Sequence, residues 1–93
     1  MTIVVRHSPV NLTRATYDES ASRLDAAGIW PNPDGLDIHL LFGTEGNLRV
    51  SELWDSREQF QAFGEQLMPI LTDMGIEFSA EPEVFEVHNL IKR

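Results

Sequence analysis

The stretch from Gly46 to Gly75 constrains the fold most, because a turn, a strand, a capped helix and a glycine stop follow one another directly. Its first half contains the run LRVSELW. Successive side chains of a strand point to opposite faces. Both alternating sets of this run contain large apolar residues, so we expect packed material against both faces of the strand.

The second half of the stretch has the start, the apolar stripe and the stop of a helix. Ser56 is a good N-cap and Gln59 stands at the capping-box spacing. One apolar stripe follows at helical spacing: Phe60, Phe63, Leu67, Leu71 and Met74. Gly75 is a natural stop. Pro69 lacks an N–H, so we expect a kink or a short break near Leu67–Met68.

The rest of the chain supplies two strands before this stretch, one strand after it, and another helix. We expect a strand over residues 2–7, a helix capped by Asn11 or Thr13 and ending near Ala27, a strand over 36–42, a hairpin turn over 44–47 and a last strand over 84–91. This order predicts one α+β domain, residues 1–93, with a ferredoxin-like βαββαβ topology. Both helices then cover one face of a four-stranded antiparallel sheet.

Charge and composition exclude several function classes. The net charge of −8 argues against nucleic acid and against anionic membranes as partners. The chain has no cysteine, so it has neither disulfides nor a thiolate zinc site. No apolar run approaches the roughly 20 residues of a membrane span. Arg6 and His7 interrupt the first apolar run too early for a signal peptide, so we expect a cytoplasmic protein.

The sheet face without helices requires a cover. One alternation exposes Val4, Leu41, Leu53, Val84 and Leu90, and the other exposes Leu48, Val50, Trp54 and Phe42. Either set would form an apolar patch at the limit of what a soluble monomer leaves exposed to solvent. Burying about 300 Å² on each of two subunits is worth roughly 15 kcal/mol before the costs of association. We therefore predict a homodimer packed sheet to sheet.

Three histidines fall on three predicted strands: His7, His39 and His88. In the expected strand order, His7 and His88 lie on neighbouring strands and His39 lies on the opposite edge. Each histidine has either a structural role, at a strand end or in the core, or a role in a pocket as an acid, a base or a hydrogen-bond donor. A metal would also need carboxylate help from Glu52 or Glu86. No recognised zinc spacing is present, so we expect no metal.

Charged and aromatic side chains near these strands leave further alternatives open. Arg6, Arg49 and Glu86 share a face with His39 and His88 under one alternation, as a structural network or as part of a pocket. Glu52 and Trp54 have two alternative roles. Either they form the apolar wall of a pocket for an aromatic ligand, with the carboxylate as its one polar group, or Trp54 packs in the dimer interface and Glu52 lies at the edge of that interface.

Trp30 lies beside a loop with two prolines and either plugs the core or covers a pocket. Other catalytic motifs are missing from the sequence. No serine stands in an elbow motif, and no phosphate loop or dinucleotide fingerprint occurs.

The run LRVSELWDSREQF resembles the dimeric α/β-barrel superfamily, and in particular its antibiotic-biosynthesis-monooxygenase-like branch with many uncharacterised relatives. The residues that carry the resemblance are Glu52, Trp54, Asp55, Ser56 and Phe60. The resemblance implies a cavity between sheet and helices, or partner loops, with Trp54 on its wall. Haem-degrading and monooxygenase relatives often carry a histidine on the second helix. This helix has Gln61, Gly64 and Gln66 at its polar positions, so we expect no cofactor.

These observations lead to three hypotheses about function. The first is a small homodimeric barrel protein that binds a small aromatic ligand beside Trp54. The second is a cofactor-independent monooxygenase- or isomerase-like enzyme acting on an aromatic or polyketide-like compound, with His39 or His88 as base and Trp54 as platform. The third is a structural or interaction module. The expected pocket residues are Trp54, Glu52, His39, Arg6 and His88.

Overall fold

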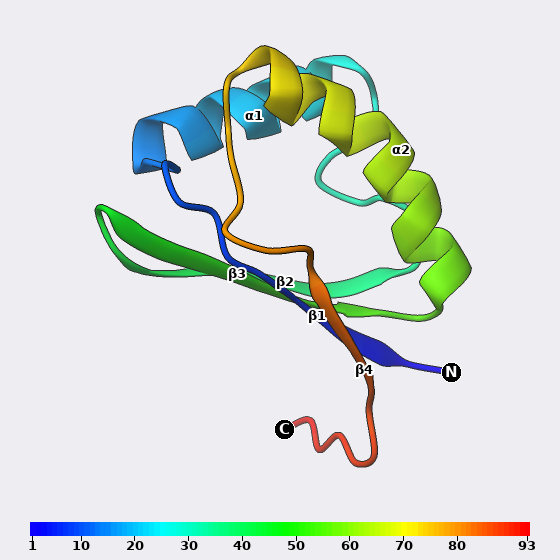
Figure 1. Ribbon diagram of the computed structural model, residues 1–93. Coiled ribbons are helices and arrows are strands. Elements are labelled where there is room, and N and C mark those ends of the chain that lie inside the picture. Colours follow the sequence, from blue (N-terminus) through cyan, green and yellow to red (C-terminus); the bar gives the residue numbers. More distant parts are fainter.

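The computed structural model describes residues 1–93 as a four-stranded antiparallel sheet with two helices. The elements are β1 (Ile3–His7), α1 (Arg14–Ala26), β2 (Leu36–Thr44), β3 (Asn47–Trp54), α2 (Arg57–Asp73) and β4 (Glu83–Glu86). The strand order is β2-β3-β1-β4. Both helices lie on the same side of the sheet (Figure 1). The expected ferredoxin-like α+β fold is confirmed.

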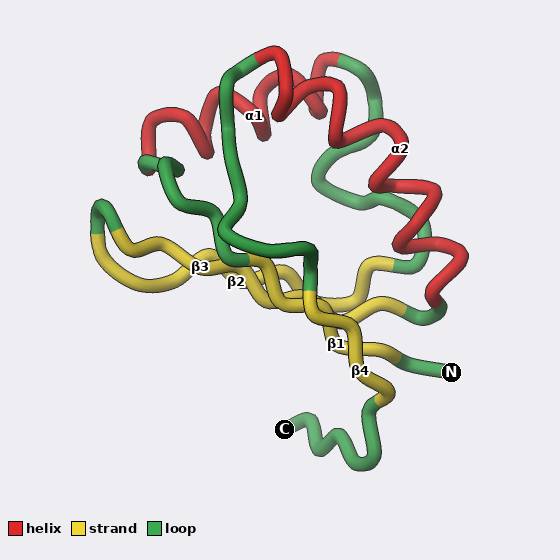
Figure 2. The backbone as a smooth tube through the Cα atoms, in the orientation of Figure 1, coloured by secondary structure: helices red, strands yellow, loops and turns green.

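Each helix begins and ends where the sequence predicts. Thr13 caps α1 and accepts a hydrogen bond from the backbone N–H of Thr16, and Ser56 caps α2 in the same way through Gln59. Asn11, the other candidate cap, instead bridges the chain to Gly75 and Glu77. Helix α2 continues through Pro69 to Asp73 without a break (Figure 2).

A bulge in β2 changes which residues share a face. The pairing with β3 shifts between Leu36 and Ile38, so Leu36 lies opposite Trp54 and packs into the core. From Ile38 onward the alternation is reversed. Leu36 and Ile38 therefore lie on opposite faces although they are two residues apart, because the bulge inserts one residue. His39 consequently lies directly opposite Glu52 on the helix side.

The last strand is shorter than the sequence predicts. We expected residues 84–91, but β4 ends at Glu86 and the sheet contacts end with a hydrogen bond from the Val87 N–H to the carbonyl of Thr2. Residues 87–93 leave the sheet on the side opposite the helices (Figure 1). Ile91 is 82% exposed there.

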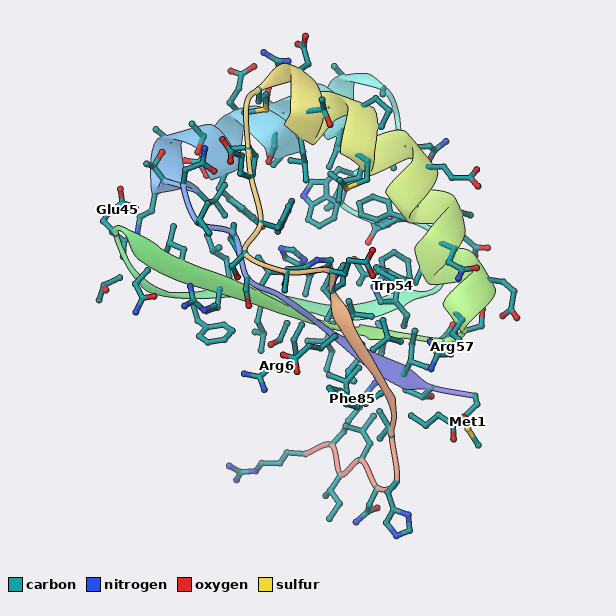
Figure 3. The ribbon with its side chains drawn as sticks, in the orientation of Figure 1. Met1, Arg6, Glu45, Trp54, Arg57 and Phe85 are labelled. Atoms are coloured by element: carbon teal, nitrogen blue, oxygen red, sulfur yellow. The ribbon has the colours of Figure 1, made fainter.

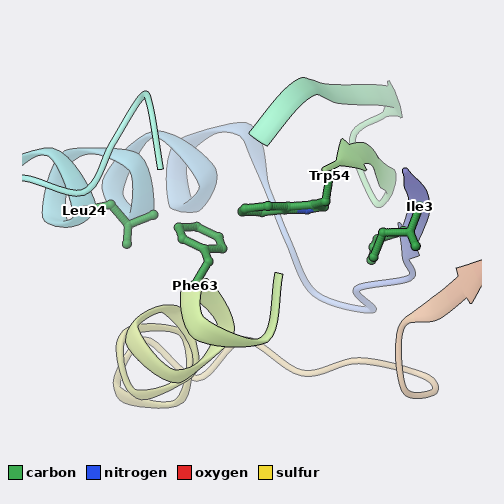
Figure 4. Close-up of a cluster of buried hydrophobic side chains, with 5 residues drawn as sticks. Ile3, Leu24, Trp54 and Phe63 are labelled. Carbon is green, nitrogen blue, oxygen red and sulfur yellow. The ribbon is translucent and has the colours of Figure 1, made fainter. Parts of the chain in front are cut away.

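The core between sheet and helices consists of two apolar clusters. The first contains Ile3, Val5, Leu24, Trp54 and Phe63, four of which are labelled in Figure 4. The second contains Leu12, Leu48, Leu71 and Ile76. Trp54, Ile3 and Val5 are fully buried, so the part of the sheet around these three residues is covered on the helix side.

The other side of the sheet, which we call the outer face, carries exposed apolar groups. Leu40, Phe42 and Phe85 are each about half exposed there. Figure 3 shows Arg6 and Phe85 pointing away from the helices. Neither of the two sets predicted from alternation is correct. Leu41 and Val84 of the first set pack on the core side, and so do Leu48 and Trp54 of the second. No helix combines the length and apolar character that a membrane crossing needs.

Candidate functional site

Glu52 is the buried polar centre of the helix side of the sheet. It lies in the middle of β3 and is 4% exposed. Its neighbours across the two flanking strands are His39 on β2 and Val5 on β1. His39 Nδ1 lies 2.7 Å from one carboxylate oxygen, and His7 Nε2 lies 3.1 Å from the other. The Trp54 indole N–H donates to the oxygen that His7 also contacts.

The pKa of Glu52 follows from two opposing effects. Burial by itself raises the pKa, but the hydrogen bonds from His39 and His7, the positive charge of protonated His7 and a smaller hydrogen bond from Trp54 lower it to about 2. The group is therefore a carboxylate at neutral pH. Because a carboxylate only accepts hydrogen bonds, His39 must donate from Nδ1 and His7 must donate from Nε2.

Tyr17 on α1 extends this chain of hydrogen bonds. Its hydroxyl lies 2.7 Å from His39 Nε2. Since His39 already donates from Nδ1, a neutral His39 accepts at Nε2 and the phenol donates. Burial raises the pKa of Tyr17, and the charges of Glu52 and Asp18 raise it further. The result is a continuous series from Tyr17 through His39 and Glu52 to His7.

His7 is the one member of this series with a free nitrogen. Its Nδ1 makes no hydrogen bond, whereas every buried side-chain nitrogen and oxygen in the chain has a partner. Nδ1 is therefore open to solvent or to a ligand. The ring is held near two aromatic neighbours, with centroid distances of 6.0 Å to Phe60 and 6.2 Å to Phe78. With Nε2–H directed at Glu52, Nδ1 carries the lone pair of a base.

Two adjoining cavities meet at His7 and Glu52. The inner cavity has a volume of about 70 Å³ and extends toward α1, where Tyr17, Ala21 and Leu24 line it. The wider cavity has a volume of about 580 Å³ and lies between α2 and the segment before β4. Its further lining residues include Phe60, Gly64, Leu67, Met68, Phe78 and Pro82. The wider cavity is in the size range of small-molecule sites, roughly 300–1,000 Å³.

Comparison with solved structures shows that the chain shares a known fold. A candidate antibiotic biosynthesis monooxygenase from Deinococcus radiodurans is 14% identical with a TM-score of 0.63, over 100% of this chain and 98% of its own. SnoaB, a cofactor-independent oxygenase from Streptomyces nogalater, is 17% identical with a TM-score of 0.60, over 99% of this chain and 96% of its own. The chain has the fold of antibiotic-biosynthesis-monooxygenase-like proteins. Rv0793 from Mycobacterium tuberculosis shares it at 15% identity and a TM-score of 0.54, over 98% and 95% of the two chains.

Other comparisons give no match. No family model matches the sequence, and no curated protein matches it. The likeness to the monooxygenase-like proteins is therefore one of fold, and the chemistry of this chain has to be argued from its own residues.

Two of the pocket residues expected from sequence lie together in this monooxygenase-like fold. Glu52 and His39 are in direct contact and both line the inner cavity. Trp54 does not line either cavity, because its side chain is fully buried in the first apolar cluster. Trp30 combines both roles considered for it. It packs against that cluster. It also lines the inner cavity, where its ring lies edge-on to the His39 ring with 4.9 Å between the ring centroids.

Arg6 and His88 lie outside the site. Arg6 is exposed on the outer face, since it alternates with Val5 and His7 along β1. His88 is exposed beyond the end of β4. The antiparallel pairing puts Glu83 opposite Arg6 and Glu86 opposite Ile3, so His7 and His88 lie toward opposite ends of the strand pair.

Tyr17 was not among the expected site residues, although a signal for it is present. It shares the apolar face of α1 with Ala21 and Leu24, and a tyrosine on such a face brings a buried hydroxyl that needs a partner. The site offers no group of three His, Cys, Asp or Glu side chains positioned to hold a metal ion. What the arrangement provides is a base, His7, backed by a buried carboxylate.

Proposed function

We propose that this chain is a cofactor-independent enzyme that removes a proton from an aromatic or polyketide-like compound in the wider cavity. The observation that carries the proposal is the buried Glu52 carboxylate, which orients His7 and leaves its Nδ1 free at the junction of the two cavities. A carboxylate behind a histidine fixes the tautomer and stabilises the imidazolium that forms on proton uptake.

The base in this proposal is His7. Both nitrogens of His39 are engaged, one by Glu52 and one by Tyr17. His88 lies outside the cavities. His39 and Tyr17 instead act on the carboxylate from its other side and keep it ionised and oriented.

The first step moves one proton from an acidic C–H bond of the compound to His7 Nδ1. The electron pair of that bond stays on carbon and delocalises into the adjoining ring or carbonyl group. An isomerase returns the proton from the imidazolium to another carbon. A monooxygenase passes the electron-rich carbanion on to dioxygen, an outcome supported by the two solved neighbours described as a monooxygenase and an oxygenase.

The oxygenase outcome balances without a cofactor. One electron passes from the carbanion to dioxygen, and the two radicals combine to form a C–O bond. The imidazolium of His7 protonates the outer oxygen to give a hydroperoxide. Loss of the second proton from the same carbon breaks the O–O bond, leaving a carbonyl group and releasing water. The methylene carbon is oxidised and both oxygen atoms are reduced.

A binding protein without catalysis is the second candidate, because the wider cavity is largely apolar and large enough for an aromatic ring. The two functions differ in whether His7 takes a proton. Deuterium exchange separates them, since it reports proton removal whatever the later steps are.

The test uses β-tetralone, an aromatic ketone with an acidic methylene group, incubated with the protein in deuterated buffer without dioxygen. We expect exchange at that methylene, followed by proton NMR, to exceed the buffer rate about 100-fold or more, a usual contribution of a positioned base. His7→Gln should reduce the excess to near the buffer rate.

His88→Gln is the matched control, because it removes an exposed histidine outside both cavities. We expect it to exchange at the wild-type rate. Exchange no faster than in buffer, combined with β-tetralone binding that protects the protein against thermal unfolding, would favour the binding protein over the enzyme.

A further inference from the structure

The inner cavity differs from the wider one in its size and in its extension toward α1. It lies between the two apolar clusters, with Leu24 and Phe63 of the first cluster and Leu71 and Ile76 of the second on its walls. Its volume of about 70 Å³ is too small for an aromatic ring with substituents. For comparison, a cavity of about 150 Å³ holds benzene, and one water needs only about 10–15 Å³.

Apart from His7 Nδ1, the side-chain polar groups on its wall are already paired. The Tyr17 hydroxyl donates to His39, His39 donates to Glu52, and the Ser20 hydroxyl donates to the Tyr17 carbonyl. A buried water needs two to four polar partners, in rough terms. His7 Nδ1 alone offers fewer partners than that, and the lining is otherwise mostly hydrophobic, so water gains little by entering the cavity. The cavity favours a small apolar molecule.

The position of the cavity gives that molecule a role. His7 and Glu52 line both cavities, so a molecule in the inner one borders the substrate at the base itself. We propose that the inner cavity is the binding site for dioxygen. This inference rests on the proposed function and adds to it the place where dioxygen binds. The oxygen then reaches the carbanion beside the same imidazolium that protonates the hydroperoxide.

Xenon tests the site without any catalysis, because it fills small apolar cavities in proteins. A crystal of the wild-type protein under xenon pressure should show xenon between Ala21 and His39. Ala21 lines only the inner cavity, and a longer side chain there projects into it. Ala21→Leu should abolish the xenon peak. Ordered water filling the wild-type cavity, or xenon bound only elsewhere, would overturn the proposal.

A kinetic experiment tests the same site during turnover. Dioxygen uptake with β-tetralone is measured with an oxygen electrode over a range of dioxygen concentrations, and deuterium exchange is measured without dioxygen. For Ala21→Leu we expect the ratio of uptake to exchange to fall several-fold, with a higher KM for dioxygen. Ala21→Val, which fills less of the space, should lie between it and the wild type.

Ala15→Leu is the matched control, because Ala15 is exposed on the same helix and lines neither cavity. It should keep the wild-type ratio. An unchanged ratio in Ala21→Leu would refute the dioxygen site while leaving proton removal intact. Absence of exchange in the wild type would instead refute the proposed function, and the xenon result would still decide whether the cavity takes a small apolar molecule.

Discussion

At the scale of single residues, Glu52 is the group whose loss should affect the chain most. Glu52→Gln places an amide where the carboxylate accepts from His7, His39 and Trp54, so at least one donor loses its partner. Hydrogen bonds to a charged group contribute about 1.5–3 kcal/mol each. We expect the free energy of unfolding in urea at neutral pH to fall by at least that much. Glu65→Gln, at an exposed position on α2, should change it by less than about 0.5 kcal/mol.

The pH dependence of stability has the same origin. The pKa of Glu52 is lowered from 4.5 to about 2 in the folded chain, so the folded state favours the charged form. That contribution is present above pH 4.5 and is lost as the pH falls toward 2, and it amounts to about 3 kcal/mol. Urea unfolding between these pH values should show a steeper loss for the wild type than for Glu52→Gln. Equal slopes would contradict the lowered pKa.

Tyr17 offers a direct optical reading of the site, because it is the only tyrosine in the chain. Burial, with the charges of Glu52 and Asp18, raises its pKa above the ordinary value of 10.0. Ultraviolet titration of the phenolate should therefore have a midpoint above that value. The midpoint should move down in Glu52→Gln, which removes one of the two negative charges. A wild-type midpoint at the ordinary value would exclude the buried Tyr17–His39 contact.

At the scale of elements, the β2–β3 hairpin depends on one glycine. Gly43 has a φ of 107°, and a Cβ added there would lie 2.5 Å from the backbone oxygen of Asn47. Gly43→Ala should lower the free energy of unfolding by about 1–3 kcal/mol, a typical cost of such strain. Gly64 in α2 has open space around it, so Gly64→Ala should instead raise stability by about 0.5–1 kcal/mol. The pair is compared by urea unfolding.

The hairpin also shows how much of the site follows from sequence. The turn at residues 44–47 is predictable, and stepping back equally along both strands from Thr44 and Asn47 pairs His39 with Glu52. The place of His7 is not predictable in this way, because β1 meets β3 only after a whole helix and its register is set by tertiary packing. Trp54 is buried rather than on a cavity wall because Phe60 and Phe63 pack on its ring.

The differences in the sheet have similarly local causes. The bulge near Leu36 and the early end of β4 depend on contacts with other strands, and residue alternation carries no information about either. The helices were easier to predict, because a cap, an apolar stripe and a terminal glycine all lie within one segment. The length of a strand, and the face to which its side chains point, depend on how two strands pair. The ends of a helix depend on a single segment of the chain.

At the scale of the whole molecule, the outer face leads us to propose that two copies of this chain pack sheet to sheet. The face has half-exposed Leu40 and Phe42 on the edge strand β2 and half-exposed Phe85 on the opposite edge strand β4. Covering about 300 Å² of such surface on each copy is worth roughly 15 kcal/mol before association costs. A second copy brings an equally apolar face, so it is the occupant that this surface fits.

Light scattering after gel filtration at micromolar concentration should give twice the mass of one chain for the wild type. Leu40→Lys places a charge on the outer face, on the edge strand β2, and should give the mass of one chain. Met68→Lys, at an exposed position on the helix side, should leave the mass unchanged. A wild-type mass of 10.5 kDa would contradict the proposed dimer.

The sharing of one carboxylate between two rings links the two cavities to each other. Each oxygen of Glu52 is assigned to one histidine, and the two oxygens rotate together about a single bond. A compound that turns the plane of His7 therefore also changes how His39 and Tyr17 are held on the far side. We therefore predict that filling one cavity changes the affinity of the other, by the same factor in both directions.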